Sequence, residues 1–286
     1  MKLFSFLLFL FCTLTVYSQT KFTGTWKGFI KSSAQSPEKA DVLYLKLGKE
    51  ENNFTGKSRV EVLHTDEFAL KSLQGTMNEN SITLKEDYIS LSSNSRNAPK
   101  CKMVYDLSYN DSTGYLEGSF KSSDCRNTVG RVVLYRTDDQ FNEERTPTAT
   151  HYWKQNFVKD YEKGFPAPEI REQERKDFQF KPIYFDHDKA EIRPEYFDYL
   201  NKMARILEGI HDLRVKVTGH TDAVGTDEYN IELSKRRAKA IKDYFKSRGI
   251  EPEKLEIDFK GERQPVDTNN TPAGKQRNRR VDFEFI

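Results

Sequence analysis

The sequence predicts two folded domains of different classes: an all-β domain, either an antiparallel barrel or a sandwich, followed by an α/β domain with the order β-α-β-α-β-β. Before residue 140, short runs of alternating apolar and polar residues are separated by polar turns, which is typical of antiparallel sheets. After residue 176, strand-like and helix-like segments alternate, which indicates a small sheet covered by helices. The length of 286 residues is sufficient for two domains.

Residues 1–18 have the pattern of a secretory signal peptide. Lys2 supplies a positive charge, Leu3–Leu14 is a short apolar stretch, and the small or β-branched residues Val16 and Ser18 precede a predicted cut before Gln19. The apolar stretch is too short for a spanning helix. We therefore expect an exported protein.

The three cysteines divide into one that is removed and two that remain. Cys12 lies in the signal peptide, and lipid attachment there is disfavoured because the preceding Phe11 stands where lipoprotein signals have a small residue. Cys101 and Cys125 remain, and an even count in an exported protein favours one disulfide. Two buried thiols are the alternative; a metal site is disfavoured because no further ligands follow at a useful spacing.

Composition excludes several classes of protein. The 46 basic and 44 acidic residues give a formal charge of +2, which argues against a nucleic-acid partner. After residue 20 no apolar run is long enough to span a bilayer as a helix. Aromatic residues make up 13% of the chain, which argues against disorder.

The first domain is expected over residues 19–140. Its strand-like runs are shorter than the roughly 9–11 residues of outer-membrane strands, and charged residues interrupt them, so we expect a water-soluble β domain. The segment Gly24–Gly28 resembles the first strand of lipocalin-like barrels. An interior filled by side chains is favoured over a cavity for a small apolar ligand. The predicted strands are Phe22–Ile30, Val42–Leu47, Arg59–Leu63, Phe68–Met77, Ser81–Leu84, Met103–Tyr109, Gly114–Phe120 and Arg131–Tyr135.

A helix and a linker are expected over residues 141–175. Aromatic residues at helical spacing predict a short packed helix from Thr150 to Gly164. Phe165–Pro168 would end it, and the charged segment that follows, to Lys176, is predicted to be a semi-rigid linker.

The second domain is expected over residues 176–286. Pro194 opens the first predicted helix, and Thr226 and Gly249 are the expected N-cap and C-cap residue of the second, which runs over residues 227–248. Alternating apolar residues predict strands over residues 178–185, 213–218, 255–259 and 281–285.

One charged residue of the second helix falls on the apolar side. At 100° per residue, Arg237 lies within the arc that contains Leu233 and Ile241, and Asn230 lies on the same side two turns earlier. A guanidinium in this position needs a partner or a route to water. One alternative is that the stem of Arg237 extends past the helix edge to water, and another is that its guanidinium pairs with a structural carboxylate. Asp222 lies in the loop before this helix. An acid and a guanidinium at one pocket would bind a zwitterion, although the two could instead bond each other.

Several ordered motifs resemble the OmpA-like C-terminal domain family, which includes the peptidoglycan-associated lipoprotein and the flagellar motor B protein. The resemblance covers residues 176–286. Its motifs are Gly219-His-Thr-Asp222-x-x-Gly225, Asn230-x-x-Leu233-Ser234-x-x-Arg237-Ala238, Tyr184-Phe185-Asp186-x-Asp188, Gly261-Glu262-x-x-Pro265 and Asn278-Arg279-Arg280-Val281.

The resemblance implies noncovalent binding of peptidoglycan through the diaminopimelate of the stem peptide. Asp222 would receive the ligand ammonium group and Arg237 its carboxylate, and Asn230 matches the pocket asparagine of the family. Of the two motif arginines, Arg279 is preferred over its neighbour Arg280 as a further contact. Thr221 and the loop backbone near Asp186 are weaker candidates.

We therefore expect a binding protein that tethers an envelope assembly or the outer membrane to the cell wall. The histidines match no metalloprotease motif, and no nucleophile elbow or phosphate loop occurs, so neither an enzyme nor a cofactor is expected. The alternatives are an apolar-ligand carrier anchored to the wall and a wall-remodelling protein. Outer-membrane proteins are further candidate partners, and the sequence does not define the oligomeric state.

Overall fold

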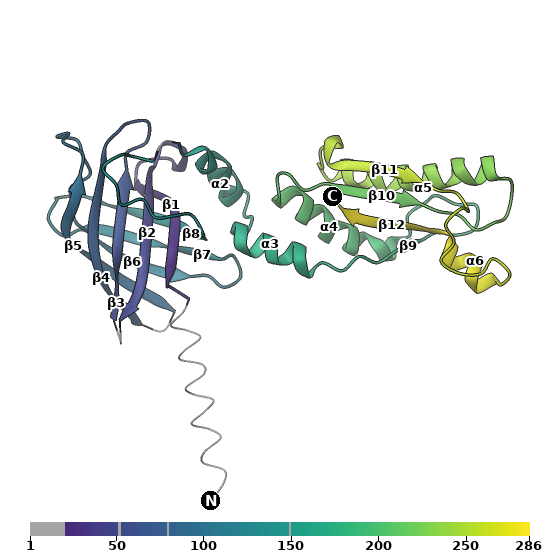
Figure 1. The fold of residues 1–286 in the computed structure, drawn as a ribbon, viewed down its shortest axis with the longest axis horizontal. Helices are drawn as coiled ribbons and strands as arrows, with labels where there is room; N and C mark the ends of the chain where they lie inside the picture. Colours follow the sequence, from purple (N-terminus) through teal and green to yellow (C-terminus); the bar gives the residue numbers. More distant parts are fainter. Residues whose placement is uncertain (1–20, 51–52, 79, 149) are drawn as a thin grey trace, which may run out of the picture. The chain divides into compact units, whose positions relative to one another are not determined.

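The computed structural model describes residues 21–50, 53–78, 80–148 and 150–286, so the predicted signal peptide lies outside the described residues. The chain divides into two compact units with the boundary between Ile170 and Arg171, a few residues before the boundary expected from the sequence. Figure 1 shows a barrel in the first unit and a sheet with helices in the second. Within the described ranges, none of the helices combines the length and the apolar character that a membrane span requires.

The first unit is a closed antiparallel barrel of eight strands, which confirms the predicted class and selects the barrel over the sandwich. Each strand pairs with the next along the chain, and β1 closes the barrel against β8. The strands are β1 (Gly24–Ser32), β2 (Asp41–Glu50), β3 (Asn53–Glu61), β4 (Phe68–Asn78), β5 (Ser81–Ser92), β6 (Met103–Tyr109), β7 (Tyr115–Ser122) and β8 (Val129–Thr137), with a short 3-10 helix η1 (Pro37–Lys39) between β1 and β2.

Side chains from all eight strands form one buried apolar cluster inside the barrel, which includes Trp26, Leu45 and Leu134. Alternation along each strand places these residues on the inner face. Glycines allow neighbouring strands to approach where the barrel curves: a Cβ atom at Gly56 would lie 2.0 Å from the carbonyl oxygen of Lys46. The interior therefore has the packed side chains that the sequence favoured.

An ion pair also lies inside the barrel, which the sequence analysis did not foresee. The Lys71 ammonium group is 2.8 Å from one carboxylate oxygen of Glu86, and both side chains are inaccessible to solvent. The same oxygen accepts the backbone N–H of Met103, while the other accepts the hydroxyl groups of Ser58 and Tyr105. Each oxygen of the carboxylate thus has two donors, the condition under which a buried charge is tolerated.

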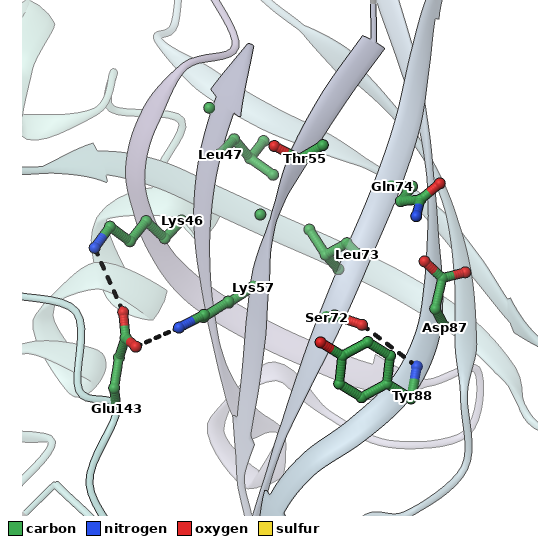
Figure 2. Close-up of a pocket in the computed structure, with 12 residues that line it drawn as sticks. Lys46, Leu47, Thr55, Lys57, Ser72, Leu73, Gln74, Asp87, Tyr88 and Glu143 are labelled. Atoms are coloured by element: carbon green, nitrogen blue, oxygen red, sulfur yellow. Dashed lines mark hydrogen bonds and ion pairs between the residues drawn. The ribbon is translucent and has the colours of Figure 1, made fainter. Parts of the chain in front are cut away.

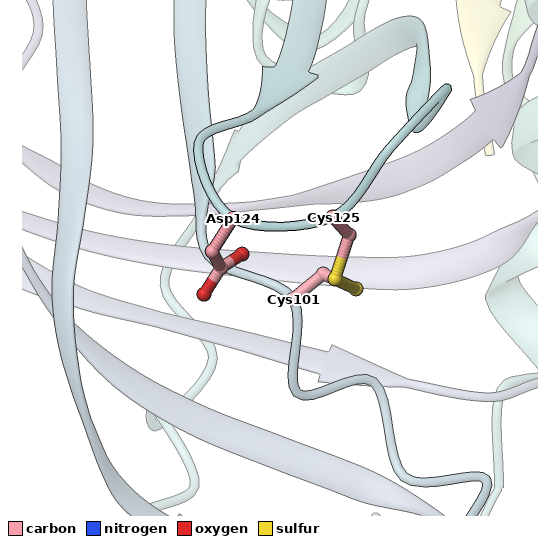
Figure 3. Close-up of side chains that lie close together, drawn as sticks. All are labelled: Cys101, Asp124 and Cys125. Atoms are coloured by element: carbon pink, nitrogen blue, oxygen red, sulfur yellow. A yellow bond between two sulfur atoms is a disulfide. The ribbon is translucent and has the colours of Figure 1, made fainter.

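The predicted disulfide joins Cys101 and Cys125, whose Cα atoms are 5.7 Å apart (Figure 3). The carbonyl oxygen of Cys101 accepts a hydrogen bond of 2.6 Å from Lys71, so the disulfide-bonded segment also caps the internal ion pair. Asp124 lies beside the two sulfur atoms. Because disulfide sulfurs are not thiolates, these three residues do not form a metal-binding set.

Two helices follow the barrel. Helix α2 (Tyr152–Glu162) lies within the predicted helical segment, and its Phe157 packs on outward-facing barrel residues such as Phe29 and Tyr135. Helix α3 (Pro168–Asp177) occupies the segment that was predicted to be a semi-rigid linker, so this segment is helical, which the sequence did not indicate, and the boundary between the two units falls within it. Pro168 suits the first position of a helix. The basic residues Arg175 and Lys176 of α3 lie in its last turn, where the helix dipole favours them.

The second unit is a four-stranded sheet in the order β11-β10-β12-β9, which confirms the predicted α/β class. Its strands are β9 (Ile183–Tyr184), β10 (Val215–Gly219), β11 (Leu255–Phe259) and β12 (Arg280–Phe285). Strand β10 is parallel to β11 and antiparallel to β12. The helices are α4 (Phe197–Gly209), α5 (Asp227–Ser247) and α6 (Pro272–Asn278), with the 3-10 helices η2 (Pro194–Tyr196) and η3 (Pro252–Lys254).

Two details of this unit differ from expectation. Strand β9 has only two residues, because Pro182 precedes it and cannot donate a backbone hydrogen bond, although Phe178 and Phe180 still pack on Phe285. The segment before β12, for which no helix was predicted, contains α6, whose N-cap residue Thr271 accepts the backbone N–H of Gly274.

Candidate functional site

The loop between β10 and α5 is held against the helix by close backbone packing. A Cβ atom at Gly219 would lie 2.1 Å from the carbonyl oxygen of Ser234, so only glycine allows this approach. Thr226 caps α5 as predicted, through a hydrogen bond from the backbone N–H of Tyr229 to its hydroxyl oxygen. These contacts place the motif residues 220–222 beside the buried face of α5.

Arg237 lies on that face and is inaccessible to solvent. Its guanidinium donates hydrogen bonds to three backbone carbonyl oxygens, those of Lys189 at 2.9 Å, His220 at 2.8 Å and Asp186 at 3.1 Å. Burial lowers the pKa of Arg237 to about 10, while the negative charge of Asp222 acts in the opposite direction. Arg237 therefore remains charged at neutral pH, and backbone oxygens rather than a carboxylate hold it in place.

Asp222 is also nearly buried, and its direct partner is Arg279. One carboxylate oxygen accepts a hydrogen bond of 2.7 Å from the Arg279 guanidinium, and the other accepts the backbone N–H of Val224 at 3.2 Å. The same first oxygen is 4.0 Å from Nδ1 of His187, an exposed side chain. The suggested direct bond between Asp222 and Arg237 is thus replaced by a bond to the arginine of the Asn278-Arg279-Arg280 motif.

The two neighbouring arginines of that motif have separate surroundings. Arg279 also donates to the carbonyl oxygen of Phe185 at 3.3 Å and to the side chain of Gln276. Arg280 instead bonds Asp282 at 2.9 Å on its own strand. The structure therefore brings Arg279, the preferred residue of the pair, to Asp222.

Thr221 lies in the loop itself, and Asn230 lies in the first turn of α5. The Asn230 amide donates a hydrogen bond of 2.6 Å to Glu262, which joins two motifs that are 32 residues apart. Within the part of the chain that the structure describes, the side-chain oxygens of Asn230 and Thr221 are buried and have no hydrogen-bond partner. Such oxygens are available to a donor group that enters the cluster.

Two residues that the sequence analysis did not select support this cluster. Asn278 holds the loop before α6 through hydrogen bonds to the backbone of Val266 and Asp267, and its amide also donates to Asn269. Asn269 in turn accepts the backbone N–H of Ala223 at 3.2 Å. Asn278 was part of a quoted motif but had no role assigned to it, whereas the only signal of Asn269 was the polar character of its segment.

The result is a compact cluster of one carboxylate and two guanidinium groups, from Asp222, Arg237 and Arg279. Its positive charge exceeds its negative charge by one, so the cluster favours a ligand that carries a carboxylate. Asp222 additionally offers an acceptor for an ammonium group if Arg279 moves. In this structure Asp222 and Arg279 pair with each other, and Arg237 donates to backbone carbonyl oxygens.

The part of the chain that is similar to known proteins lies in the second unit. Residues 184–279 match the model of the OmpA family. The chain is 38% identical over 103 residues to outer membrane protein A of Bordetella avium, covering 36% of this chain and 53% of that protein. It is 39% identical over 102 residues to the peptidoglycan-associated lipoprotein of Pseudomonas aeruginosa, covering 36% of this chain and 60% of that protein.

Among solved structures, the peptidoglycan-associated lipoprotein of Burkholderia pseudomallei matches with 28% identity and a TM-score of 0.37, over 37% of this chain and 90% of that chain. The chain thus spans between about half and three fifths of the two curated relatives named above. The second unit contains an OmpA-like domain, as its motifs indicated.

Proposed function

We propose that the OmpA-like domain binds peptidoglycan noncovalently through the diaminopimelate of the stem peptide and tethers an envelope assembly or the outer membrane to the cell wall. The relatives named as peptidoglycan-associated lipoproteins support the polymer class. The observation that carries the proposal is the meeting of Asp222, Arg237 and Arg279 in one cluster, from three motifs distant in sequence.

The ion pair between Asp222 and Arg279 suggests how the ligand would enter. The ligand ammonium group replaces the guanidinium of Arg279 at the Asp222 carboxylate, and the released guanidinium turns to the ligand carboxylate. Arg237 stays anchored to its backbone oxygens and adds a fixed positive charge. The ligand thus exchanges one set of charge-assisted bonds for another, so we expect modest affinity.

The proposed location is the periplasm, with association to the outer membrane through partner proteins. The predicted signal peptide and the disulfide support export to an oxidising compartment. The polarity of the barrel supports an aqueous surrounding, because its main apolar cluster lies inside, whereas transmembrane barrels turn an apolar band outward.

The packed barrel interior argues against the alternative of an apolar-ligand carrier, because inward-facing side chains from every strand occupy the space that such a ligand would need. No observation favours wall remodelling. The barrel is therefore a second module that takes no part in the proposed contact with the wall.

A sedimentation assay with purified peptidoglycan tests the proposal. Asp222→Asn removes the charge but keeps an oxygen for Val224, and it should reduce retention of the full chain about tenfold or more. Asp243→Asn, on the exposed face of α5, is the matched control and should bind normally.

Lysine-type peptidoglycan provides the ligand control, because lysine lacks the second carboxylate of diaminopimelate. We expect weak retention on lysine-type walls. Equal retention on both wall types would contradict diaminopimelate recognition, and normal retention of Asp222→Asn would contradict the role of the cluster.

A further inference from the structure

The outer surface of the barrel carries a groove of about 530 Å³ across strands β2 to β5 (Figure 2). Its volume is in the range of small-molecule sites, about 300–1,000 Å³. Small or short residues on the outer face, such as Gly48, Thr55 and Ser72, leave the space above the strands open. The groove lies wholly within the first unit and is separate from the cluster around Asp222.

Two lysines form one end of the groove. Lys46 and Lys57 are directly opposite each other in the β2–β3 pairing, an arrangement that is unfavourable for like charges. Glu143 lies between them, 3.5 Å from the Lys46 ammonium group and closer to that of Lys57, as Figure 2 shows. Lys57 and Lys46 hold the pKa of Glu143 below its ordinary value. One carboxylate thus serves two cations, and all three side chains are partly open to solvent.

The other end is built by a β-bulge. Lys71 pairs with Ile89 while Leu73 pairs with Glu86, so the single residue Ser72 faces both Asp87 and Tyr88. A bulge of this kind redirects side chains, and here both residues line the groove. The Tyr88 ring is 64% exposed, which is unusual for a large aromatic side chain.

The groove therefore has an exposed aromatic ring beside the polar side chains of Gln74 and Asp87, and a pair of cations at its far end. An aromatic face can cover the apolar face of a sugar ring, while an amide and a carboxylate bind its hydroxyl groups. The lysines add a site for a carboxylate, and Glu143 occupies that site from within the chain. A neutral sugar would leave the lysines unused.

We propose that this groove binds an acidic oligosaccharide, with one sugar ring on Tyr88 and a carboxylate group of another sugar residue at Lys46 and Lys57, where it displaces Glu143. This binding is independent of the proposed wall contact of the OmpA-like domain. Glu143 acts as an internal competitor, so its removal should strengthen the binding of the acid.

Calorimetric titration of the full chain at low ionic strength tests the proposal, with α-1,4-linked trigalacturonate as the acidic probe and the corresponding neutral galactotriose as its control. We expect the acid to bind about tenfold more tightly than the neutral sugar, because only the acid forms charge-assisted bonds. Equal affinity, or no binding of either probe, would overturn the proposal.

Three variants locate the site. Tyr88→Ala should weaken the binding of the acid about tenfold, whereas Tyr152→Ala, a matched exposed tyrosine outside the groove, should have no effect. The double variant Lys46→Gln, Lys57→Gln should remove the preference for the acid.

Glu143→Gln gives the sharpest result, because it should tighten the binding of the acid about fivefold and leave that of the neutral sugar unchanged. A weaker or unchanged affinity of this variant for the acid would refute the competitor role. Asp222→Asn should bind trigalacturonate normally, so failure of the wall contact and failure of the groove are distinguishable.

Discussion

Arg237→Ala should destabilise the OmpA-like domain as well as weaken its ligand binding. The substitution removes three hydrogen bonds, of 2.8 to 3.1 Å, from a charged donor to the backbone oxygens of two loops. At about 1.5 kcal/mol for each charged hydrogen bond, the loss is about 4.5 kcal/mol. This is a large share of the roughly 5–15 kcal/mol that stabilises a typical domain.

The distribution of tryptophans provides an assay that separates the two units. Trp26 and Trp153 both lie in the first unit, so tryptophan fluorescence reports barrel unfolding, while most of the helical circular dichroism comes from the second unit. In urea, Arg237→Ala should lower the midpoint seen by circular dichroism by about 3 M, for a slope of about 1.5 kcal/mol per M. The midpoint seen by fluorescence should not change.

Arg236→Ala is the matched control, because Arg236 is the exposed neighbour on the same helix. It should leave both midpoints close to those of the wild type. A circular-dichroism midpoint of Arg237→Ala equal to that of Arg236→Ala would refute the argument that the backbone oxygens depend on Arg237. In that case Arg237→Ala would test ligand binding without a change in stability.

Three further predictions concern the barrel and use the tryptophan signal. Lys71→Met leaves the Glu86 carboxylate buried without its cation and should lower the unfolding free energy by about 3–5 kcal/mol; a wild-type value would contradict the importance of the pair. Replacing Cys101 and Cys125 with serine should cost about 3 kcal/mol, because the disulfide closes a loop across a sequence separation of 24, and an unchanged midpoint would count against it. Burial alone would raise the pKa of Glu61, but hydrogen bonds from His151, Arg59 and the backbone of Thr148 lower it below 4.5. Because folding lowers the pKa of Glu61, the stability that its ionised form contributes is complete above pH 4.5 and is lost as the pH falls towards the pKa in the folded state. Glu61→Gln should therefore lose less unfolding free energy than the wild type over this acid range, and identical acid profiles would be evidence against this role.

Local patterns in the sequence predicted the secondary structure well where one residue period dominates. Alternation predicted a run that overlaps each of the eight barrel strands, although the third run was predicted at Arg59–Leu63 and β3 covers Asn53–Glu61. The helical arc correctly placed Arg237 on the buried side of α5. The same reasoning failed for α3, because a charged segment can be helical when its charges suit the helix dipole.

The partners of charged groups were harder to predict from the sequence. From the sequence, water, a structural carboxylate and Asp222 were the candidate partners of Arg237, but its partners are backbone oxygens, whose positions depend on loop conformation. The pairing of Asp222 with Arg279 spans 57 residues and depends on the pairing of strands β10 and β12, which precede and follow these residues. The pairing of Lys71 with Glu86 lies beside a bulge in strand β5, and no periodic pattern reveals where a bulge occurs.

The three hydrogen bonds of Arg237 have a mechanical consequence for the proposed binding of a polymer by this domain. The guanidinium cross-links the loop after β9 and the loop after β10 to a helix of 21 residues. A pulling force on a ligand at Asp222 would therefore pass into α5 and the sheet behind it instead of peeling away a single loop. Tension along the wall would then be resisted by the whole domain core.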